Sequence, residues 1–437
     1  MASQILKFKK MRIITFFLLF IFSLQIKGQD TLKVMSYNLL NYGNITSYCT
    51  ATNNSLLAKE QDLRAIVKYV KPEILAVVEL AANSYVHQRL LDSALNCDGV
   101  KYYKKANYSN ISGSDLVSML YYDSRILTFS KQYVLNSHVR DIVLYRLFYN
   151  DPNLSQTHDT AFINCIVGHL KSGSAFSDEQ DRATMTTNAM SWLNQNLIAD
   201  NYLIMGDFNL KNSSEVAYQN LVNFSNASLL FFDPISRAGM WYNTASFSDI
   251  HTQSTHVSST GCASIGGLDD RFDFILASNS VMNGINHFTY IPNSYYCLGN
   301  DGNHFNDAIN SGTNNSAPQN IINSLYNLSD HLPVILKLKV NKQGASLGNI
   351  LNTHNLNIKV VNPITNNLKF YISSSINSKL RIEVISIIGQ LLFAENIYHA
   401  SYEEIINLNF SSLESGLFFL KITDENGFSI SHKILKL

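Results

Sequence analysis

The pentapeptide Ser329-Asp330-His331-Leu332-Pro333 leads directly into the apolar run Val334-Ile335-Leu336. Pro333 restrains the backbone at the entrance of what reads as a strand, and the Asp-His pair places an imidazole beside a carboxylate. A neighbouring carboxylate raises the basicity of an imidazole and fixes its tautomer, which a hydrolytic general base requires. The pattern therefore predicts that His331 acts as the base of a hydrolase.

Further upstream, four apolar runs each finish on polar residues suited to the same chemistry. Asn38 follows residues 34–37, Glu79 follows 74–78, His169 follows 162–168, and Asp207 and Asn209 follow 202–206. Alternate residues of an extended chain point the same way, so Asp207 and Asn209 share one side and Phe208 takes the other. Asp273 directly precedes another apolar run, 274–276. Strands aligned in one sheet would bring these groups together at a single edge.

Carboxylates and carboxamides at such an edge favour a hard cation that prefers oxygen ligands, so we expect Mg²⁺, with Mn²⁺ as a substitute. A metal held by Glu79 would neutralise charge on a phosphate group. Asn38, Asn209 and His169 can donate hydrogen bonds to the same phosphoryl oxygens, and His331 would take a proton from water. These groups together predict hydrolysis of a phosphodiester or phosphomonoester.

The chain resembles the endonuclease/exonuclease/phosphatase superfamily in an ordered set of short motifs between about Leu32 and Leu338. The matching stretches are Met35–Asn38, Pro72–Glu79, Asp115–Tyr121, Gly168–Ser172, Met205–Asn209, Asp270–Ile275 and Ser329–Pro333. The resemblance implies an α+β, DNase-I-like four-layer sandwich, in which two mixed β-sheets are flanked by helices. It places the active site across the upper edge of the sheets.

The same resemblance assigns roles to individual residues. It implies that Glu79 is a metal ligand, with Asp330 nearby and Asn38 assisting, and that Asp273 orients His331. It also implies that Asp207 and Asn209 position the nucleophile and the phosphate, and that His169 contacts the scissile phosphate. Where the superfamily usually has Gln before the metal-binding Glu, this chain has Val78, as do similar secreted bacterial nucleases.

The sequence determines the substrate less closely than it determines the reaction. We expect an extracellular endonuclease acting on DNA or RNA; the alternatives are a sphingomyelinase-like phospholipid phosphodiesterase and a non-catalytic surface-binding module.

Lys171 and Arg182 are candidate phosphate ligands, although such residues also solvate helix starts. Two polar segments, 243–267 and 299–319, flank the Asp273 strand and are expected to be long loops, which either shape the cleft or are mobile decoration without a role in it. Outside residues 1–28 there are 28 basic and 33 acidic residues, a net charge of −5, so bulk charge does not attract polyanions.

The two ends of the chain predict export. Residues 1–28 combine basic residues with an apolar run, Ile13 to Ile26, which is typical of a signal peptide and short of the roughly 20 residues that span a bilayer.

We expect the main domain at 29–340, a linker at 341–357 and a β-sandwich at 358–437. In this last part, Asn362-Pro363, Leu380–Gln390, Leu413–Phe418 and Ser429–Leu437 resemble the type A sorting domain of type IX secretion. This resemblance implies passage through the periplasm of a Gram-negative cell to the medium or cell surface. A sugar- or protein-binding adhesion module is the alternative for this part. We expect a monomer without a membrane span once the leader is removed.

Five cysteines leave at least one thiol unpaired. Cys165 lies in an apolar run and is expected to be a buried thiol. Cys49 with Cys97, and Cys262 with Cys297, are plausible disulfides in an exported protein. Their spacing does not suggest a zinc site.

Overall fold

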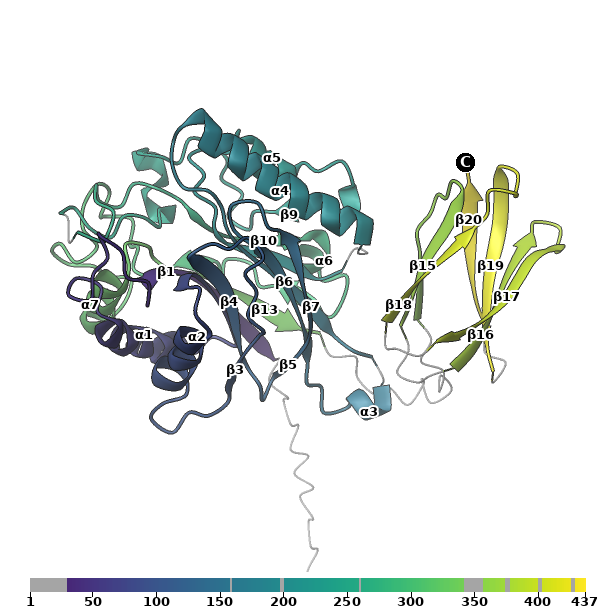
Figure 1. Cartoon of the computed structure of the whole chain (residues 1–437), viewed down its shortest axis with the longest axis horizontal. Coiled ribbons are helices and arrows are strands. Elements are labelled where there is room, and N and C mark those ends of the chain that lie inside the picture. The colour runs from purple at the N-terminus through teal and green to yellow at the C-terminus, as the bar shows by residue number, and fades with distance from the viewer. Residues whose placement is uncertain are drawn as a thin grey trace, which may run out of the picture.

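The computed structural model describes residues 30–157, 159–196, 200–258, 261–341, 357–373, 378–399, 403–425 and 429–437. The predicted signal peptide, residues 1–28, lies outside these ranges, as does the predicted linker apart from its end residues 341 and 357. The first four ranges form one large domain, and the remaining four form a smaller unit made of strands (Figure 1).

The large domain is built on two β-sheets. The first has the strand order β11-β13-β1-β2-β4-β3, with β12 also paired to β13, and the second has the order β5-β6-β7-β8-β10-β9. The strands are β1 Thr31–Tyr42, β2 Ile74–Ala81, β3 Tyr103–Lys105, β4 Leu116–Asp123, β5 Leu127–Asn136, β6 Ile142–Tyr149, β7 Phe162–His169, β8 Tyr202–Asp207, β9 Phe231–Phe232, β10 Asp273–Ser278, β11 Phe288–Tyr290, β12 Tyr296–Cys297 and β13 Val334–Val340. Both sheets are mixed, since β1–β2 and β7–β8 are parallel and their other neighbours antiparallel.

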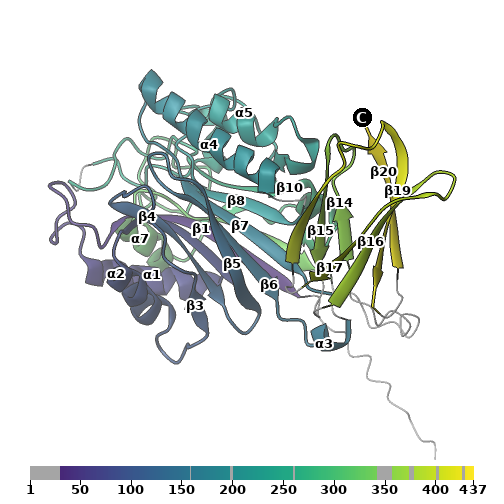
Figure 2. The same cartoon turned by 45° about the vertical axis from the view of Figure 1, so that its right-hand side comes forward.

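Helices cover the outer face of each sheet (Figures 1 and 2). The helices are α1 Leu56–Val70, α2 Ser84–Leu90, η1 Leu91–Leu95, α3 Leu154–Thr157, α4 Phe176–Asn196, α5 Val216–Val222, η2 Ala227–Leu229, η3 Ala245–Ile250, α6 Asn279–Asn283 and α7 Gln319–Leu328. Helices α1 and α7 lie against the first sheet, while α4 and α5 lie against the second. This arrangement of helix, sheet, sheet and helix confirms the predicted α+β four-layer sandwich.

The alternation of side chains along each strand explains the layers. In β8, Leu203 and Met205 point into the core between the two sheets, whereas Tyr202 and Ile204 point to the other face and pack under α4. Strands buried on both faces read as continuous apolar runs, which is why residues 202–205 are all apolar or aromatic. The same rule applies to β7, where Cys165 is buried between the sheets as predicted.

Helix α1 ties the site region together. Ser55 caps its N-terminus by accepting a hydrogen bond from the Ala58 amide, and Lys71, just before Pro72, ends it in a left-handed conformation. The ammonium group of fully buried Lys59 donates to the carbonyl oxygens of Leu39 and Leu40 at 2.8 Å and of Leu328 at 2.5 Å. These bonds join the end of β1 to the end of α7.

The C-terminal strands form a small β-sandwich, as predicted. One sheet has the order β14-β15-β18 and the other β17-β16-β19-β20. The strands are β14 Asn357–Val360, β15 Asn367–Ser373, β16 Ser378–Ser386, β17 Leu391–His399, β18 Glu403–Asn409, β19 Gly416–Asp424 and β20 Ser429–Lys436. Buried side chains such as Phe370, Ile382 and Leu420 fill the space between the sheets. None of the described helices is both long enough and apolar enough to cross a membrane.

Candidate active site

Strand register brings three of the candidate residues into one row. His169 at the end of β7 is the Cα partner of Asp207 at the end of β8, and Asp207 is in turn the partner of Asp273 at the start of β10. In the other sheet, Asn38 of β1 pairs with Val78 of β2, and the register shifts directly after it. The two sheets therefore present these residues at the same edge.

Glu79 reaches the site through an irregular backbone. Its φ is +61°, in the left-handed region that a residue with a Cβ adopts at a cost of roughly 1–2 kcal/mol. The pairing of β2 with β4 skips from Val77 to Leu80 at this point, so Glu79 leaves the sheet pattern and turns into the pocket. Its Oε1 accepts from Asn38 Nδ2 at 3.0 Å, and its Oε2 accepts from the Asn41 amide at 2.9 Å.

His331 lies between two carboxylates. Its Nδ1 is 2.8 Å from Asp273 Oδ2, and its Nε2 is 3.7 Å from Asp207 Oδ2. Burial lowers the pKa of His331, but the carboxylates of Asp273 and Asp207 outweigh burial, so the pKa rises well above its ordinary value. The bond to Asp273 fixes the ring orientation and leaves Nε2 as the atom that faces the pocket.

Glu79, His169 and Asp207 form a compact group of potential metal ligands, with one ligand atom from each lying within 4.8 Å of the others. His169 Nε2 is 3.3 Å from Asp207 Oδ2 and 3.9 Å from Glu79 Oε1. Burial, with Arg140 and His331 nearby, lowers the pKa of His169 well below its ordinary value, so the ring is neutral. Burial also raises the pKa of Asp207. Bringing carboxylates this close in a buried place favours a bound cation.

Asn38 and Asp330 lie around this group in different ways. Asn38 Nδ2 donates to Asp207 Oδ2 at 3.0 Å as well as to Glu79, and its Oδ1 accepts from the Leu40 amide. In this orientation Asn38 bridges the two carboxylates as a donor. Asp330 Oδ2 accepts from the Ser264 amide at 2.8 Å, whereas its buried Oδ1 has no hydrogen-bond partner in the described part of the chain. That free carboxylate oxygen suits a cation.

Asn209 is held next to Asp207. Its backbone amide donates to Asp207 Oδ1 at 3.0 Å, and its side-chain amide donates to the Leu170 carbonyl at 3.3 Å. The φ of +50° at Asn209 turns the chain at this point. Both residues line the pocket, which places the carboxylate and the carboxamide on the same side, as the alternation of Asp207, Phe208 and Asn209 predicted.

Arg182 does not fit the prediction that it binds substrate. The residue is 0 % exposed, and its guanidinium binds Glu215 Oε2 at 2.7 Å and 2.9 Å and the carbonyls of Lys171 and Gly173 at 3.0 Å. A substrate phosphate cannot reach it, because its helix face points inward. Lys171 precedes α4 and is partly exposed, and its ammonium is 2.7 Å from Oδ1 of Asp178 in the first turn of that helix.

The structure adds Gln253, which sequence reasoning missed. Its side-chain Nε2 lies 2.6 Å from His331 Nε2. A carboxamide can donate to the neutral ring or, when flipped, accept from the imidazolium, so Gln253 can serve both protonation states. The one signal in the sequence was its place in the polar segment 243–267. That segment does line the pocket, whereas segment 299–319 contributes no residue to it.

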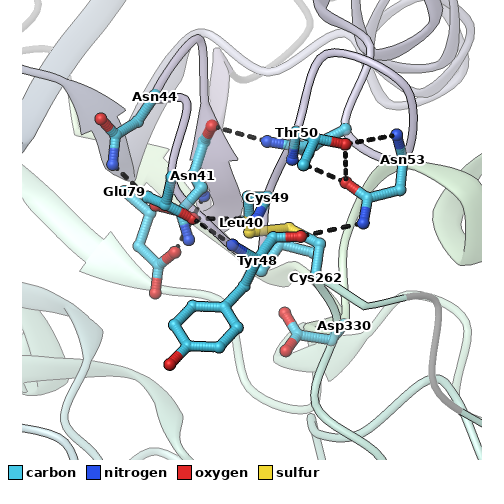
Figure 3. The surroundings of a disulfide bond; sticks show 12 residues. Leu40, Asn41, Asn44, Tyr48, Cys49, Thr50, Asn53, Glu79, Cys262 and Asp330 are labelled. Carbon is cyan, nitrogen blue, oxygen red and sulfur yellow. Dashed lines mark hydrogen bonds between the residues drawn. A yellow bond between two sulfur atoms is a disulfide. The ribbon is translucent and has the colours of Figure 1, made fainter.

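The disulfide also differs from expectation. Cys49 is bonded to Cys262, across a sequence separation of 213, while Cys97, Cys165 and Cys297 are free thiols. The pairings Cys49–Cys97 and Cys262–Cys297 were therefore wrong. The bond joins the loop after β1 to the segment that carries Ser264, and Figure 3 shows Glu79 and Asp330 on either side of it.

These side chains surround a cavity of about 420 Å³, within the usual range for ligand sites. The residues that line it are Leu40, Asn41, Glu79, His169, Ser172, Gly173, Ser174, Asp207, Asn209, Lys211, Tyr242, Gln253, Cys262, Ser264, Asp270, Phe272, Asp330 and His331. Most of them are polar. The cavity therefore suits a polar, charged ligand better than an apolar one.

Comparison with known proteins identifies the C-terminal part. Residues 362–436 match the family described as "Secretion system C-terminal sorting domain". These residues are a sorting domain. The match indicates a secreted or cell-surface protein and supports the predicted relationship to the secretion machinery. No curated protein matches the chain.

Solved structures resemble the large domain. An endonuclease/exonuclease/phosphatase family protein from Bacteroides thetaiotaomicron is 14 % identical, with 72 % of this chain and 96 % of that chain covered and a TM-score of 0.44. D. rerio TDP2 complexed with single strand DNA product is 10 % identical, with coverage of 71 % and 100 % and a TM-score of 0.45. The human Nocturnin catalytic domain is 12 % identical, with coverage of 72 % and 98 % and a TM-score of 0.43.

Proposed function

We propose that the large domain is a metal-dependent phosphodiesterase that acts on nucleic acid outside the cell, most simply as an endonuclease. The observation that carries this proposal is the position of His331, held by Asp273 at 2.8 Å and facing the cavity beside the Glu79, His169 and Asp207 group. A base, a neutral donor and clustered carboxylates at one cavity are the parts that phosphoester hydrolysis requires.

The proton path starts at His331. In the unprotonated form of His331, with Nδ1–H donated to Asp273, the Nε2 lone pair can take a proton from a water molecule in the cavity, and Asp273 stabilises the imidazolium that results. The water oxygen then forms the new bond to phosphorus as the bond to the leaving oxygen breaks. The leaving oxygen ends with a proton drawn from solvent or from a neighbouring acid. Neutral His169 and the Asn209 carboxamide are placed to donate to phosphoryl oxygens.

Glu79 is the proposed main ligand of a Mg²⁺ ion, with Mn²⁺ able to replace it, and Asp207, Asn38 and Asp330 surround the same place. The fit is supported by the oxygen-rich donor set and by the buried, unpartnered Oδ1 of Asp330 within the described residues. When bound, such an ion neutralises negative charge on the phosphate. The protein's own part is to hold these oxygens in place, through Asn38 and the Asn41 amide.

The test uses purified residues 29–437 with plasmid DNA, RNA and sphingomyelin, each with Mg²⁺ or EDTA. We expect nicking of DNA or cleavage of RNA that requires the metal and is lost in His331→Ala. His287→Ala is the matched control, because His287 pairs with Asp159 and does not line the cavity. Release of choline phosphate with nucleic acid left intact would move the assignment to a phospholipid phosphodiesterase. Binding without turnover of any substrate would favour a non-catalytic module.

The sorting domain gives an independent prediction about location. Deleting residues 358–437 should retain the protein inside the cell, because the matched region 362–436 is then missing. Immunoblots of cell and medium fractions measure this directly. Normal release of the truncated protein would contradict the proposed role of these residues in export.

A further inference from the structure

Beside the candidate catalytic groups, the cavity wall carries a lysine and a tyrosine that the backbone couples. The amides of Trp241 and Tyr242 both donate to the Lys211 carbonyl, at 2.9 Å and 3.1 Å. The Lys211 ammonium lies 4.8 Å from the centre of the Tyr242 ring. The Lys211 amide donates to Glu215 Oε1 at 2.7 Å, and Glu215 is itself held by buried Arg182. The pair is thus fixed to the interior of the domain.

Both side chains remain available to a ligand. Tyr242 is 43 % exposed and lines the cavity, so a face of its ring can be covered by a planar group. Lys211 makes no ion pair with an acidic side chain in the part of the chain that the structure describes, unlike Lys171, which is bound by Asp178. The charge of Lys211 acts on the carboxyl group of Asp270 without an ion-pair contact between them, and a cation placed like this next to a hydrolytic centre suits a second phosphate group of the substrate.

Asp270 supplies a third, complementary group. Its side chain lines the cavity, the residue is only 9 % exposed, and its Oδ1 has no hydrogen-bond partner among the described residues. Mutual backbone bonds to Gln253, at 2.8 Å and 3.0 Å, hold it in place. Burial and the neighbouring Asp269 raise the pKa of Asp270 to about 7, so this side chain can exchange a hydrogen bond with a hydroxyl or amino group of a ligand. Lys211 and Asp270 therefore offer a cation and a hydrogen-bonding group to different parts of a substrate.

We propose that Lys211, Tyr242 and Asp270 form a subsite for the nucleotide next to the scissile phosphodiester of an unpaired strand. Lys211 binds the adjacent phosphate, the base stacks on Tyr242, and Asp270 accepts a hydrogen bond from a sugar hydroxyl or a base amino group. This inference rests on the proposed function and narrows its substrate class.

The requirement for an unpaired strand follows from the ring. Both faces of a base inside a duplex are covered by its neighbours, so the base must be unstacked before Tyr242 can cover it. A quaternary ammonium head group also favours an aromatic ring, but at this ring it would meet the ammonium of Lys211, 4.8 Å away. The pair therefore favours a nucleic acid strand over a choline phospholipid.

The experiment compares kcat/KM for a single-stranded oligonucleotide, its matched duplex and the small diester methyl p-nitrophenyl phosphate. Stacking on an aromatic side chain contributes about 1–3 kcal/mol per base, which corresponds to about 5- to 150-fold. Tyr242→Ala should lower the ratio of oligonucleotide to small-diester activity by about that factor, and Tyr242→Phe should restore it. Tyr69→Ala, an exposed tyrosine of α1, is the control and should leave the ratio unchanged.

Two further variants test the charges. Lys211→Met should weaken oligonucleotide hydrolysis and flatten its dependence on salt, and Asp270→Asn should lower kcat/KM for the oligonucleotide more than for the small diester. An unchanged ratio in Tyr242→Ala, an equal preference of the wild type for duplex and single strand, or a Tyr242-dependent hydrolysis of sphingomyelin would each overturn the subsite.

Binding separates this inference from the proposed catalysis. In His331→Ala, a fluorescent single-stranded oligonucleotide should bind with Ca²⁺ present, and adding Tyr242→Ala should weaken its Kd by about the same 5- to 150-fold. If the wild type hydrolyses no phosphodiester while this difference in Kd is seen, the proposed function fails and the subsite stands. If hydrolysis depends on His331 but the Kd does not depend on Tyr242, the reverse holds.

Discussion

Breaking the Cys49–Cys262 bond should loosen the cavity and lower the stability of the large domain. The bond closes a loop across a sequence separation of 213. In the chain-entropy model, a loop of that length restricts the unfolded state by about 5 kcal/mol at 25 °C, and measured disulfides typically contribute about 2–4 kcal/mol. We expect Cys49→Ser/Cys262→Ser to lose about 2–4 kcal/mol of unfolding free energy.

The corresponding thermal shift can be worked out from the size of the domain. The described span from Asp30 to Asn341 is about 310 residues, so its unfolding entropy near 60 °C is about 0.65 kcal/mol/K. A loss of about 2–4 kcal/mol then lowers Tm by about 3–6 °C. Differential scanning fluorimetry under non-reducing conditions measures this shift, and dithiothreitol added to the wild type should reproduce it.

Activity supplies a second readout. The bonded segment carries Ser264, whose amide donates to Asp330 at 2.8 Å, so reduction should weaken metal binding as well as stability. Mn²⁺ titration by calorimetry measures that effect. Cys97→Ser is the matched control, since Cys97 is a free and partly exposed thiol. If the double variant melts within 1 °C of the wild type and binds Mn²⁺ equally well, the reasoning about this loop is refuted.

Three other perturbations test separate contacts. Lys59→Met leaves three buried carbonyl oxygens without a donor and should cost about 3 kcal/mol in urea unfolding, whereas Lys68→Met, at an exposed ion pair, should change stability by less than about 1 kcal/mol. Asp273→Asn removes the carboxylate that most opposes the effect of burial on the His331 pKa. Since the base works only when unprotonated, the rising limb of the pH–rate profile should move to lower pH while kcat falls about 10²- to 10⁴-fold; an unmoved limb would count against His331 as the base. Gln253→Met should lower kcat about fivefold with KM unchanged, because one hydrogen bond of about 1 kcal/mol to the base is lost. Equal kcat values for the variant and the wild type would exclude that role.

Much of the large domain could be predicted from the sequence, because the apolar runs and the polar residues beside them indicate the same fold. His169 and Asp207 are the last residues of β7 and β8, and Asn38 lies within β1; aligned strands bring such residues together whatever the loops do. The α+β layers followed from the strands and helices in the same way. Glu79 was found from its place after the apolar run 74–78, but its left-handed backbone was not, since nothing in residues 74–81 shows that the strand pairing shifts.

What the sequence could not supply depended on how distant segments meet. Arg182 is a residue type that often binds phosphate, and it lies early in a helix. Its inward orientation depends on the packing of α4 against residues 211–215, which cannot be read from the sequence. The partner of Cys49 depends on the path of segment 243–267, which has no periodicity to predict from. Gln253 was missed for the same reason.

The buried Arg182–Glu215 pair has a consequence for engineering. It supports two stretches of the cavity rim from behind, one through the carbonyls of Lys171 and Gly173 and the other through the Lys211 amide. Ser172 and Ser174 face the cavity and take no part in that support through their side chains, whereas Gly173 has a φ of +110° and a Cβ at this position would clash with Asp178 Oδ2. A library that randomises Ser172 and Ser174 while retaining Gly173, Arg182 and Glu215 can therefore search for new specificities on an unchanged scaffold.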